Sequence, residues 1–226
     1  MDNKNERKID VFLLEFPDPR LGPVLGCDLR ILDESASVAQ LLDSLDQFAA
    51  ARLADCRGCD GCCQERAPLT SADVPALAAL VGNSLPYPVH AALERFAQVE
   101  VNAGVSDIYL RREQDGVCRQ LDRGKSLCRI WPSRAFVCRS HFCLPRSPRL
   151  ELLRQAIVNQ GLNQLTRLIL AEEAQGAPPL TRLPLAQLLN PEDYPANAFT
   201  GKRGYEDIRL KDCVEPRLWR QLTADA

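Results

Sequence analysis

The chain has 226 residues, of which 46% are hydrophobic and 26% are charged. This composition is typical of a globular protein and excludes a disordered chain. The formal net charge of -2 argues against a dedicated nucleic-acid binder. Nothing at the N-terminus resembles a signal peptide, and no apolar run approaches the roughly 18 residues of a membrane span. We therefore expect a cytoplasmic protein without a membrane segment.

The cysteine content is unusual, with ten cysteines against two histidines and one methionine. In an oxidising compartment this number would indicate disulfides, whereas in a reducing compartment such thiols bind metal or carry out redox chemistry. A chain of this length can bury a sufficient core without disulfides. The expected cytoplasmic location therefore favours metal binding.

The segment before the first cysteine group predicts two strands and a helix. Residues 10–16 and 24–32 read as strands separated by a turn rich in proline and glycine. Ser37 and Gln40 form a capping-box pattern, and apolar residues then recur at helical spacing as far as Ala49. This helix leads directly to the first cysteine group.

The segment between the two cysteine groups predicts two helices and a hairpin. Thr70 or Ser71 can cap a first helix, and residues 88–101 predict a second. Residues 107–112 and 117–121 read as the two strands of a hairpin around an Asp-Gly turn.

The C-terminal part predicts mainly helix. Residues 133–137 predict a short helix, and Ser147 followed by proline predicts the start of a long helix with an interruption near Gly161. From residue 177 onward prolines and polar residues dominate, with a short helix expected over residues 185–189. This last part reads as either a packed arm or a partly ordered tail.

The first cysteine group is the strongest functional signal in the chain. It places four cysteines within eight residues, at Cys56, Cys59, Cys62 and Cys63. A spacing of two residues lets a tight turn bring two sulfurs onto one metal, and Gly58 and Gly61 supply the backbone freedom. Adjacent side chains point in different directions, so one zinc would hold both Cys62 and Cys63 with difficulty. Two metals or a cluster of several irons can use both.

A second cysteine group consists of Cys118, Cys128, Cys138 and Cys143. A metal with sulfur bonds of about 2.3 Å can tie together the separate elements that carry them. The eight cysteines suit two four-thiolate zinc sites, or one iron–sulfur cluster with further thiols nearby. For this second group, buried core thiols are the alternative.

The other cysteines and the two histidines are weaker candidates for ligands. Cys27 and Cys213 stand alone and are interpreted as buried thiols. His90 is interpreted as a structural residue of a helix. His141 follows Cys138 at a zinc-ligand spacing, but Cys143 is the favoured ligand of the two.

Basic residues crowd the second group across residues 119–149. They are Arg119, Arg123, Lys125, Arg129, Arg134, Arg139, Arg146 and Arg149, and they face only Asp122 within the segment. The first interpretation is that they compensate the charge of metal-bound thiolates. The alternative is a docking surface for a phosphate-bearing or acidic partner near Arg129, Arg134 and Arg139.

Several short motifs in the middle of the chain resemble one known family. The matching pieces are Cys56-x-x-Cys59-x-Gly61-Cys62-Cys63, Leu69-Thr70-x-x-Asp73-Val74, Gly116-x-Cys118-x-x-Leu121, Cys128-x-Ile130-Trp131-x-x-Arg134, Cys138-Arg139 and Cys143. In order and spacing they resemble the YkgJ-type CxxCxxCC cysteine-cluster family, known as a zinc- or iron-chelating domain. Trp131 stands where that family usually has tyrosine, and Ala135 where it usually has proline.

The resemblance implies that the eight cysteines of the two groups are ligands of zinc or iron, a 4Fe-4S cluster included. Flagellin lysine N-methylases share a related cysteine cluster, which makes an iron–sulfur-dependent group-transfer enzyme the first alternative to a metal-binding protein. A nucleic-acid or protein adaptor that uses the arginine-rich segment is the second. The sequence does not reveal a substrate.

The expected fold is α+β and mostly helical, with a small irregular, metal-stapled cysteine core, short strands or a hairpin, and packed helices. Residues 1–55 are expected to form the N-terminal strands and helix, and residues 56–145 the metal-binding core. Residues 146–176 are expected to be a helical part of the same domain, and residues 177–226 a C-terminal arm or tail.

Overall fold

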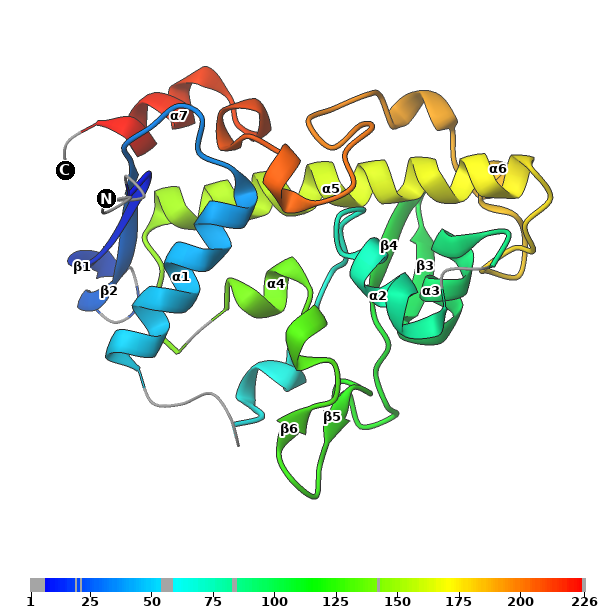
Figure 1. Ribbon diagram of the computed structural model, residues 1–226, viewed down its shortest axis with the longest axis horizontal. Coiled ribbons are helices and arrows are strands. Elements are labelled where there is room, and N and C mark those ends of the chain that lie inside the picture. Colours follow the sequence, from blue (N-terminus) through cyan, green and yellow to red (C-terminus); the bar gives the residue numbers. More distant parts are fainter. Residues whose placement is uncertain are drawn as a thin grey trace, which may run out of the picture.

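The computed structural model describes residues 7–18, 20, 22–53, 59–82, 85–141 and 143–224. The fold is α+β and mostly helical, as predicted, with three antiparallel sheets of two strands each among the described residues (Figure 1). Within the same residues, no helix combines the length and the apolar character that crossing a membrane requires.

The N-terminal hairpin and first helix follow the prediction closely. Strand β1 (Ile9–Asp18) pairs antiparallel with β2 (Gly22–Ile31), so both strands extend further towards the turn than expected. Helix α1 (Val38–Arg52) begins with the predicted capping box. The Ser37 hydroxyl accepts a hydrogen bond from the Gln40 amide, and the Gln40 side chain accepts one from the Ser37 amide.

Helix α5 (Pro148–Ala174) is the longest helix and runs along most of the molecule (Figure 1). The predicted interruption at Gly161 is wrong, because the helix continues through that residue. A Cβ atom at Gly161 would lie 2.4 Å from the Cβ of Thr70, and the Ser71 amide donates to the Gly161 carbonyl at 3.0 Å. The glycine therefore allows a neighbouring segment to approach the helix closely.

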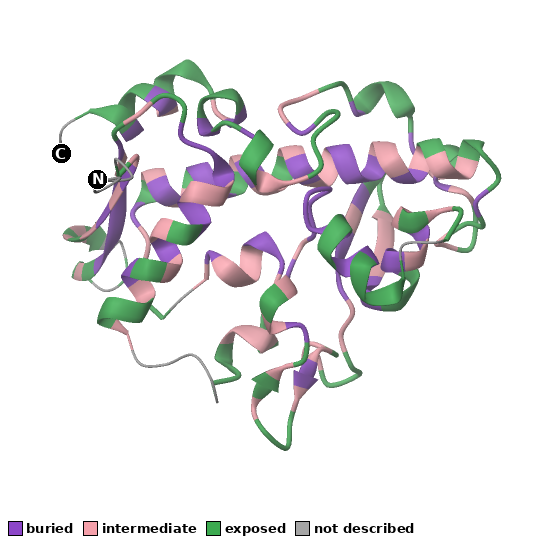
Figure 2. Ribbon diagram, viewed as in Figure 1, coloured by how far each residue is buried: buried purple, intermediate pink, exposed green. Residues whose placement is uncertain are grey.

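Two apolar clusters lie along α5 (Figure 2). The first packs β1, β2 and α1 against the N-terminal half of α5, where Leu150, Leu153 and Ile157 are fully buried. The C-terminal arm closes this cluster with Phe199 and with α7 (Pro216–Thr223), a helix that the sequence analysis did not predict. The arm is therefore packed.

The second cluster lies against the C-terminal half of α5. It contains α2 (Val74–Val81), α3 (Pro88–Phe96), β3 (Ala97–Asn102), β4 (Val105–Leu110) and α6 (Leu185–Leu188).

Three predictions in this region differ from the structure. The second helix ends at Phe96, because residues 97–102 form a strand that pairs with β4 through a tight turn containing Gly104 at φ 77°. Strand β4 consequently pairs with β3. The predicted turn around Asp115 and Gly116 is present, but residues 117–119 pair with residues 111–113, which lie beyond the end of β4, and the Cys118 amide also donates to the Cys63 carbonyl. The helix expected to be capped by Thr70 or Ser71 begins later, at Val74.

A third layer lies below the middle of α5 in the view of Figure 1. It contains the tight turn Gly61–Gln64, the short strands β5 (Leu121–Asp122) and β6 (Leu127–Cys128), the turn Trp131–Ser133, and α4 (Phe136–Arg139). We call residues 59–65 and 111–141 the cysteine layer.

Candidate metal centre

The cysteine layer surrounds a small cavity of about 50 Å³, and both predicted cysteine groups meet there. Six thiols line it, those of Cys59, Cys62, Cys63, Cys118, Cys128 and Cys138. Cys56 lies outside the described residues. Cys143 is exposed and does not line the cavity, so the structure does not bring it to the other thiols.

A backbone hydrogen bond joins the two cysteine groups directly. The tight turn Gly61–Gln64 presents Cys62 and Cys63, and it closes with the Cys63 amide donating to the Asp60 carbonyl at 2.9 Å. The Cys118 amide then donates to the Cys63 carbonyl at 2.8 Å. This bond therefore holds two segments that are far apart in the sequence next to each other at the cavity.

Cys118 and Cys128 are placed beside each other by the hairpin of β5 and β6. Leu121 of β5 is the pairing partner of Cys128, and the Arg129 amide donates to the Gln120 carbonyl at 2.8 Å. A further hydrogen bond of 2.9 Å, from the Arg119 amide to the Arg111 carbonyl, ties the hairpin to the chain that leaves β4. Strand β6 thus carries Cys128 to the cavity wall, and Cys118 reaches it from the segment just before β5.

Cys138 is carried by α4, whose first amide is bound by the carboxylate of Asp73. The Phe136 amide donates to Asp73 Oδ1 at 2.9 Å, and the Thr70 amide donates to Oδ2 at 2.8 Å. The Tyr205 hydroxyl donates to Oδ1 at 2.6 Å. Asp73 is only 4% exposed, and burial raises the pKa of its carboxyl group. One buried carboxylate thus positions the helix that carries a thiol.

Sequence reasoning did not assign this role to Asp73. Its only signal was the Leu69–Val74 motif shared with the family, in which an aspartate follows Thr70 by three residues. The partners Phe136 and Tyr205 come from distant parts of the chain, so no local pattern could reveal them.

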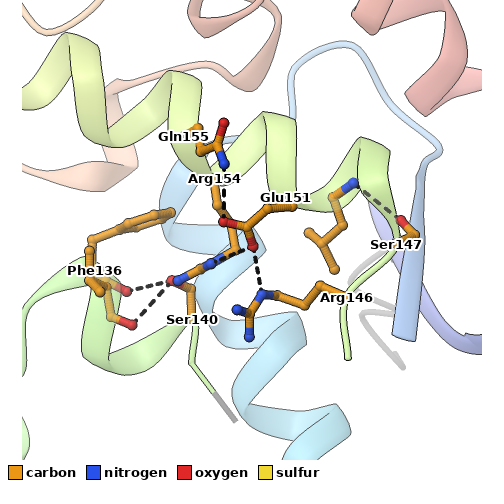
Figure 3. A network of polar contacts seen from close by, with 9 residues as sticks. Phe136, Ser140, Arg146, Ser147, Glu151, Arg154 and Gln155 are labelled. Atoms are coloured by element: carbon orange, nitrogen blue, oxygen red, sulfur yellow. Dashed lines mark hydrogen bonds and ion pairs between the residues drawn. The ribbon is translucent and has the colours of Figure 1, made fainter. Parts of the chain in front are cut away.

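The other end of α4 is fixed to α5 by a polar network (Figure 3). The Ser140 hydroxyl donates to the Phe136 carbonyl at 2.8 Å and accepts a hydrogen bond of 3.0 Å from Arg154 Nε. Arg154 and Arg146 both bind Glu151 Oε2, at 2.7 and 2.8 Å. Arg154 is only 6% exposed, so its pairing with Glu151 offsets the free energy of burying its charge.

The thiols of the cavity differ in acidity. A hydrogen bond from Cys63 lowers the pKa of Cys62 to about 6, and the nearby Arg134 guanidinium acts in the same direction. Burial raises the pKa of Cys118, Cys128 and Cys138. In the absence of a cation these three thiols keep their protons, which a thiophilic metal would displace on binding.

Arg134 is the cationic residue of the cavity wall. Its guanidinium carbon lies 3.8 Å from the centre of the Trp131 ring, and Nη2 lies 3.9 Å from Asp46 Oδ1. Its Nε is buried and has no hydrogen-bond partner among the described residues. An N–H group without a partner beside several sulfur atoms fits a site that holds thiolates, because an anionic sulfur can accept this hydrogen bond.

The six thiols therefore fit a thiophilic metal, because sulfur is the donor such metals prefer and because all six line one cavity. In the part of the chain that the structure describes, no three Cys, His, Asp or Glu side chains are already arranged as a group that could hold an ion. His141 also lines the cavity, and burial together with Arg146 and Arg154 lowers its pKa, which favours the neutral imidazole that metals bind.

Most arginines of the segment 119–149 are paired with carboxylates. The ion pairs are Arg119–Glu113, Arg123–Asp115, Arg134–Asp46, Arg139–Asp43, Arg139–Asp46, Arg146–Glu151 and Arg149–Asp28. The acidic partners lie outside the segment, several of them in α1 and β2. The positive charges of these arginines are therefore largely balanced by carboxylates from outside the segment. Compensation of thiolate charge and a docking partner near Arg129, Arg134 and Arg139 both stay predictions.

The remaining candidates have structural surroundings. Cys27 and Cys213 are buried in the first apolar cluster, as expected. His90 is 3% exposed, and its Nδ1 lies 2.6 Å from Glu172 Oε2. All the cysteines within the described residues are free thiols.

The comparison with family models identifies the segment that contains this site. The CxxCxxCC family, described as "Putative zinc- or iron-chelating domain", matches residues 55–151 and confirms the predicted resemblance. The matched segment contains the whole cysteine layer and reaches the first turn of α5. Comparisons with curated proteins and with solved structures gave no match. The family match and the shared cavity together support metal binding as the class of function.

Proposed function

We propose that this chain is a metal-binding protein in which thiolates of both cysteine groups hold zinc or an iron–sulfur centre. The observation that carries the proposal is the convergence of six thiols, from three separate parts of the cysteine layer, on one cavity. Thiolates select zinc, copper(I) or iron–sulfur clusters over magnesium and calcium. The family match independently indicates zinc or iron.

The number of thiols favours a centre with more than one metal ion. A mononuclear zinc site takes four ligands, whereas six described thiols line the cavity, the adjacent Cys62 and Cys63 among them. Two zinc ions with shared thiolates, or a cluster of several irons, would use this set more fully. Either metal would stabilise the fold of the cysteine layer, and an iron–sulfur centre would also allow electron transfer.

The proposed ligands are the six lining cysteines, with Cys56 as the seventh from the predicted set. Cys56 is included because its two-residue spacing from Cys59 suits a shared metal. Cys143 is omitted because its side chain is exposed and away from the cavity wall. The surrounding residues have two roles: Arg134 supplies positive charge, and Asp73 holds the helix that carries Cys138.

The direct experiment is to purify the protein without oxygen and to measure zinc, iron and acid-labile sulfide per chain. Stoichiometric zinc with a colourless protein indicates the zinc form, and iron with equivalent sulfide and visible absorption indicates the cluster. A well-folded preparation that contains neither zinc nor iron would contradict the proposal. Group transfer and adaptor functions stay predictions from the sequence, because no specific contact among the described residues favours either.

A further inference from the structure

We infer that His141 provides an imidazole nitrogen to the metal centre, in the role that the sequence analysis expected for Cys143. The inference rests on the proposed function, since it names an additional donor at the same site. It adds a nitrogen ligand to a set that consists otherwise of sulfur.

The first argument is the position of His141 relative to Cys138. Cys138 lies in α4 (Phe136–Arg139), and His141 is three residues later, directly after Ser140, which ends the helix. Both line the cavity, whereas Cys143, two residues further on, is exposed. The short segment from Cys138 to His141 therefore brings one sulfur and one imidazole to the same cavity.

The second argument is that the backbone before His141 is held rigidly. Ser140 is fully buried, and its amide and hydroxyl both donate to the Phe136 carbonyl, at 2.9 and 2.8 Å. Arg154 of α5 donates to the same hydroxyl and is itself held by Glu151 (Figure 3). This network fixes the backbone immediately before His141, and a ligand needs such a rigid attachment to keep its position.

The third argument is the direction of the chain after Cys143. The Cys27 amide donates to the Pro145 carbonyl at 2.8 Å, and the Ser147 amide donates to the Cys27 carbonyl at 2.9 Å. These bonds attach residues 145–147 to β2 and so to the first apolar cluster, whereas Cys118, Cys128 and Cys138 pack against the second. The chain is thus tied to a different part of the molecule soon after Cys143.

The chemistry of imidazole suits either metal. Histidine completes thiolate sites of zinc, and in some iron–sulfur centres it replaces cysteine at one iron. The chain contains only two histidines, and His90 is buried in α3 beside Glu172. Imidazole scattering detected at the metal can therefore be assigned to His141.

The test is X-ray absorption at the edge of the bound metal, in the wild type and in the variants His141→Ala and Cys143→Ser. The outer-shell scattering of an imidazole ring is expected in the wild type and in Cys143→Ser, and its loss is expected in His141→Ala. Metal affinity should fall at least about tenfold in His141→Ala, since even loss of an outer-shell partner weakens metal binding about 10- to 100-fold. A third variant, His141→Cys, should restore affinity with a shell of sulfur only.

Three results would overturn the inference. They are metal-bound wild type without imidazole scattering, imidazole scattering that persists in His141→Ala, and a loss of affinity in Cys143→Ser as large as that in His141→Ala. The first leaves the thiolate centre intact and rejects His141 alone. Wild type that binds neither zinc nor iron rejects the proposed function itself, so the two failures are distinguishable.

Discussion

The scaffold along α5 and the cysteine layer beneath it are built in different ways. The scaffold consists of long elements whose apolar faces are fully buried, such as Leu41 and Leu45 of α1 and Leu153 of α5. The cysteine layer has strands of two residues, and Figure 2 shows it mostly exposed or half-buried. Among its described residues the largest fully buried side chain is Phe136, which belongs to the first apolar cluster.

This contrast shows where the free energy of folding comes from in each region. Burial of a leucine contributes about 1.5–3 kcal/mol, and the scaffold has many such residues. The cysteine layer has few, and it depends on backbone hydrogen bonds, on ion pairs and on the proposed metal. Structural zinc in small peptides contributes about 10–16 kcal/mol, enough to fold a region that lacks a core of its own.

The largest expected effect is that of metal removal. Chelation should loosen the cysteine layer, with several kcal/mol of local stability lost, and should leave the scaffold folded. Hydrogen exchange is the measurement: the amides of Cys118, Arg119 and Arg129 should lose protection, whereas those of α5 should keep it. Unchanged protection of the three amides after complete metal removal would show that the layer is stable without a metal.

The next largest effect is expected at Asp73, which links the two regions. Asp73→Ala leaves the amides of Thr70 and Phe136 and the hydroxyl of Tyr205 without their acceptor. We expect a loss of about 3 kcal/mol in the free energy of unfolding, because buried donors without partners cost about 1–3 kcal/mol each. Urea unfolding measures the loss, and Asp193→Ala, at an exposed position, is the control.

Asp73 should also make stability depend on pH. Burial raises its pKa in the folded state, so the folded protein holds this proton to higher pH than the unfolded chain does. The contribution is present below the ordinary carboxyl pKa and is lost as pH rises through the raised value. The Asp73→Ala variant should lack this part of the pH dependence; if it retains the full dependence, other groups are responsible.

A smaller effect is expected at Gly161, where α5 contacts the segment before α2. Alanine is favoured over glycine in a helix by about 1 kcal/mol, but the new Cβ would lie 2.4 Å from the Thr70 Cβ and 3.0 Å from the Phe199 ring. Overpacking costs about 1–3 kcal/mol, so Gly161→Ala should lower the free energy of unfolding overall. Asn159→Ala, on the exposed face of the same helix, should not. Equal effects in thermal unfolding would contradict the close contact.

The smallest effect is expected at Arg139, which ties α4 to α1. Its guanidinium lies 2.7 Å from Asp46 and 3.1 Å from Asp43, in partly exposed ion pairs worth about 1 kcal/mol or less. Arg139→Ala should lower stability by about this amount. The Arg129 side chain donates one long hydrogen bond of 3.4 Å, to the Arg119 carbonyl, among the residues that the structure describes, so Arg129→Ala should change stability by less than about 0.5 kcal/mol. If the two variants have equal free energies of unfolding in urea, the ion pairs of Arg139 do not contribute to stability.

Local signals allowed part of the fold to be predicted from the sequence. The capping box at Ser37 and the proline after Ser147 mark helix starts through contacts within a few residues, and both helices begin there. Residues 97–101 were assigned to the end of the helix predicted over residues 88–101, because their apolar residues continue its pattern. Pairing with β4, which no local pattern contains, makes them a strand.

In the candidate site, too, local patterns revealed some residues, whereas others depend on contacts between distant segments. The close spacing of Cys56 to Cys63 revealed the first group. The cysteines themselves indicated the second group, and the family resemblance implied that they are ligands rather than core thiols. His141 lines the cavity and Cys143 does not. This difference depends on how Asp73 and Arg154 hold α4, through contacts between distant segments. Such tertiary contacts also explain why Asp73 was not recognised.

The central claim is that both cysteine groups hold the same metal centre. Its most direct test is the metal content and affinity of two variants, Cys62→Ser from the first group and Cys128→Ser from the second, with Cys213→Ser as the buried control. A shared centre predicts that either of the first two variants weakens the binding of all the metal, while Cys213→Ser retains it. If Cys62→Ser and Cys128→Ser each lose a separate part of the metal and bind the rest as tightly as the wild type, the groups form independent sites and the claim is wrong.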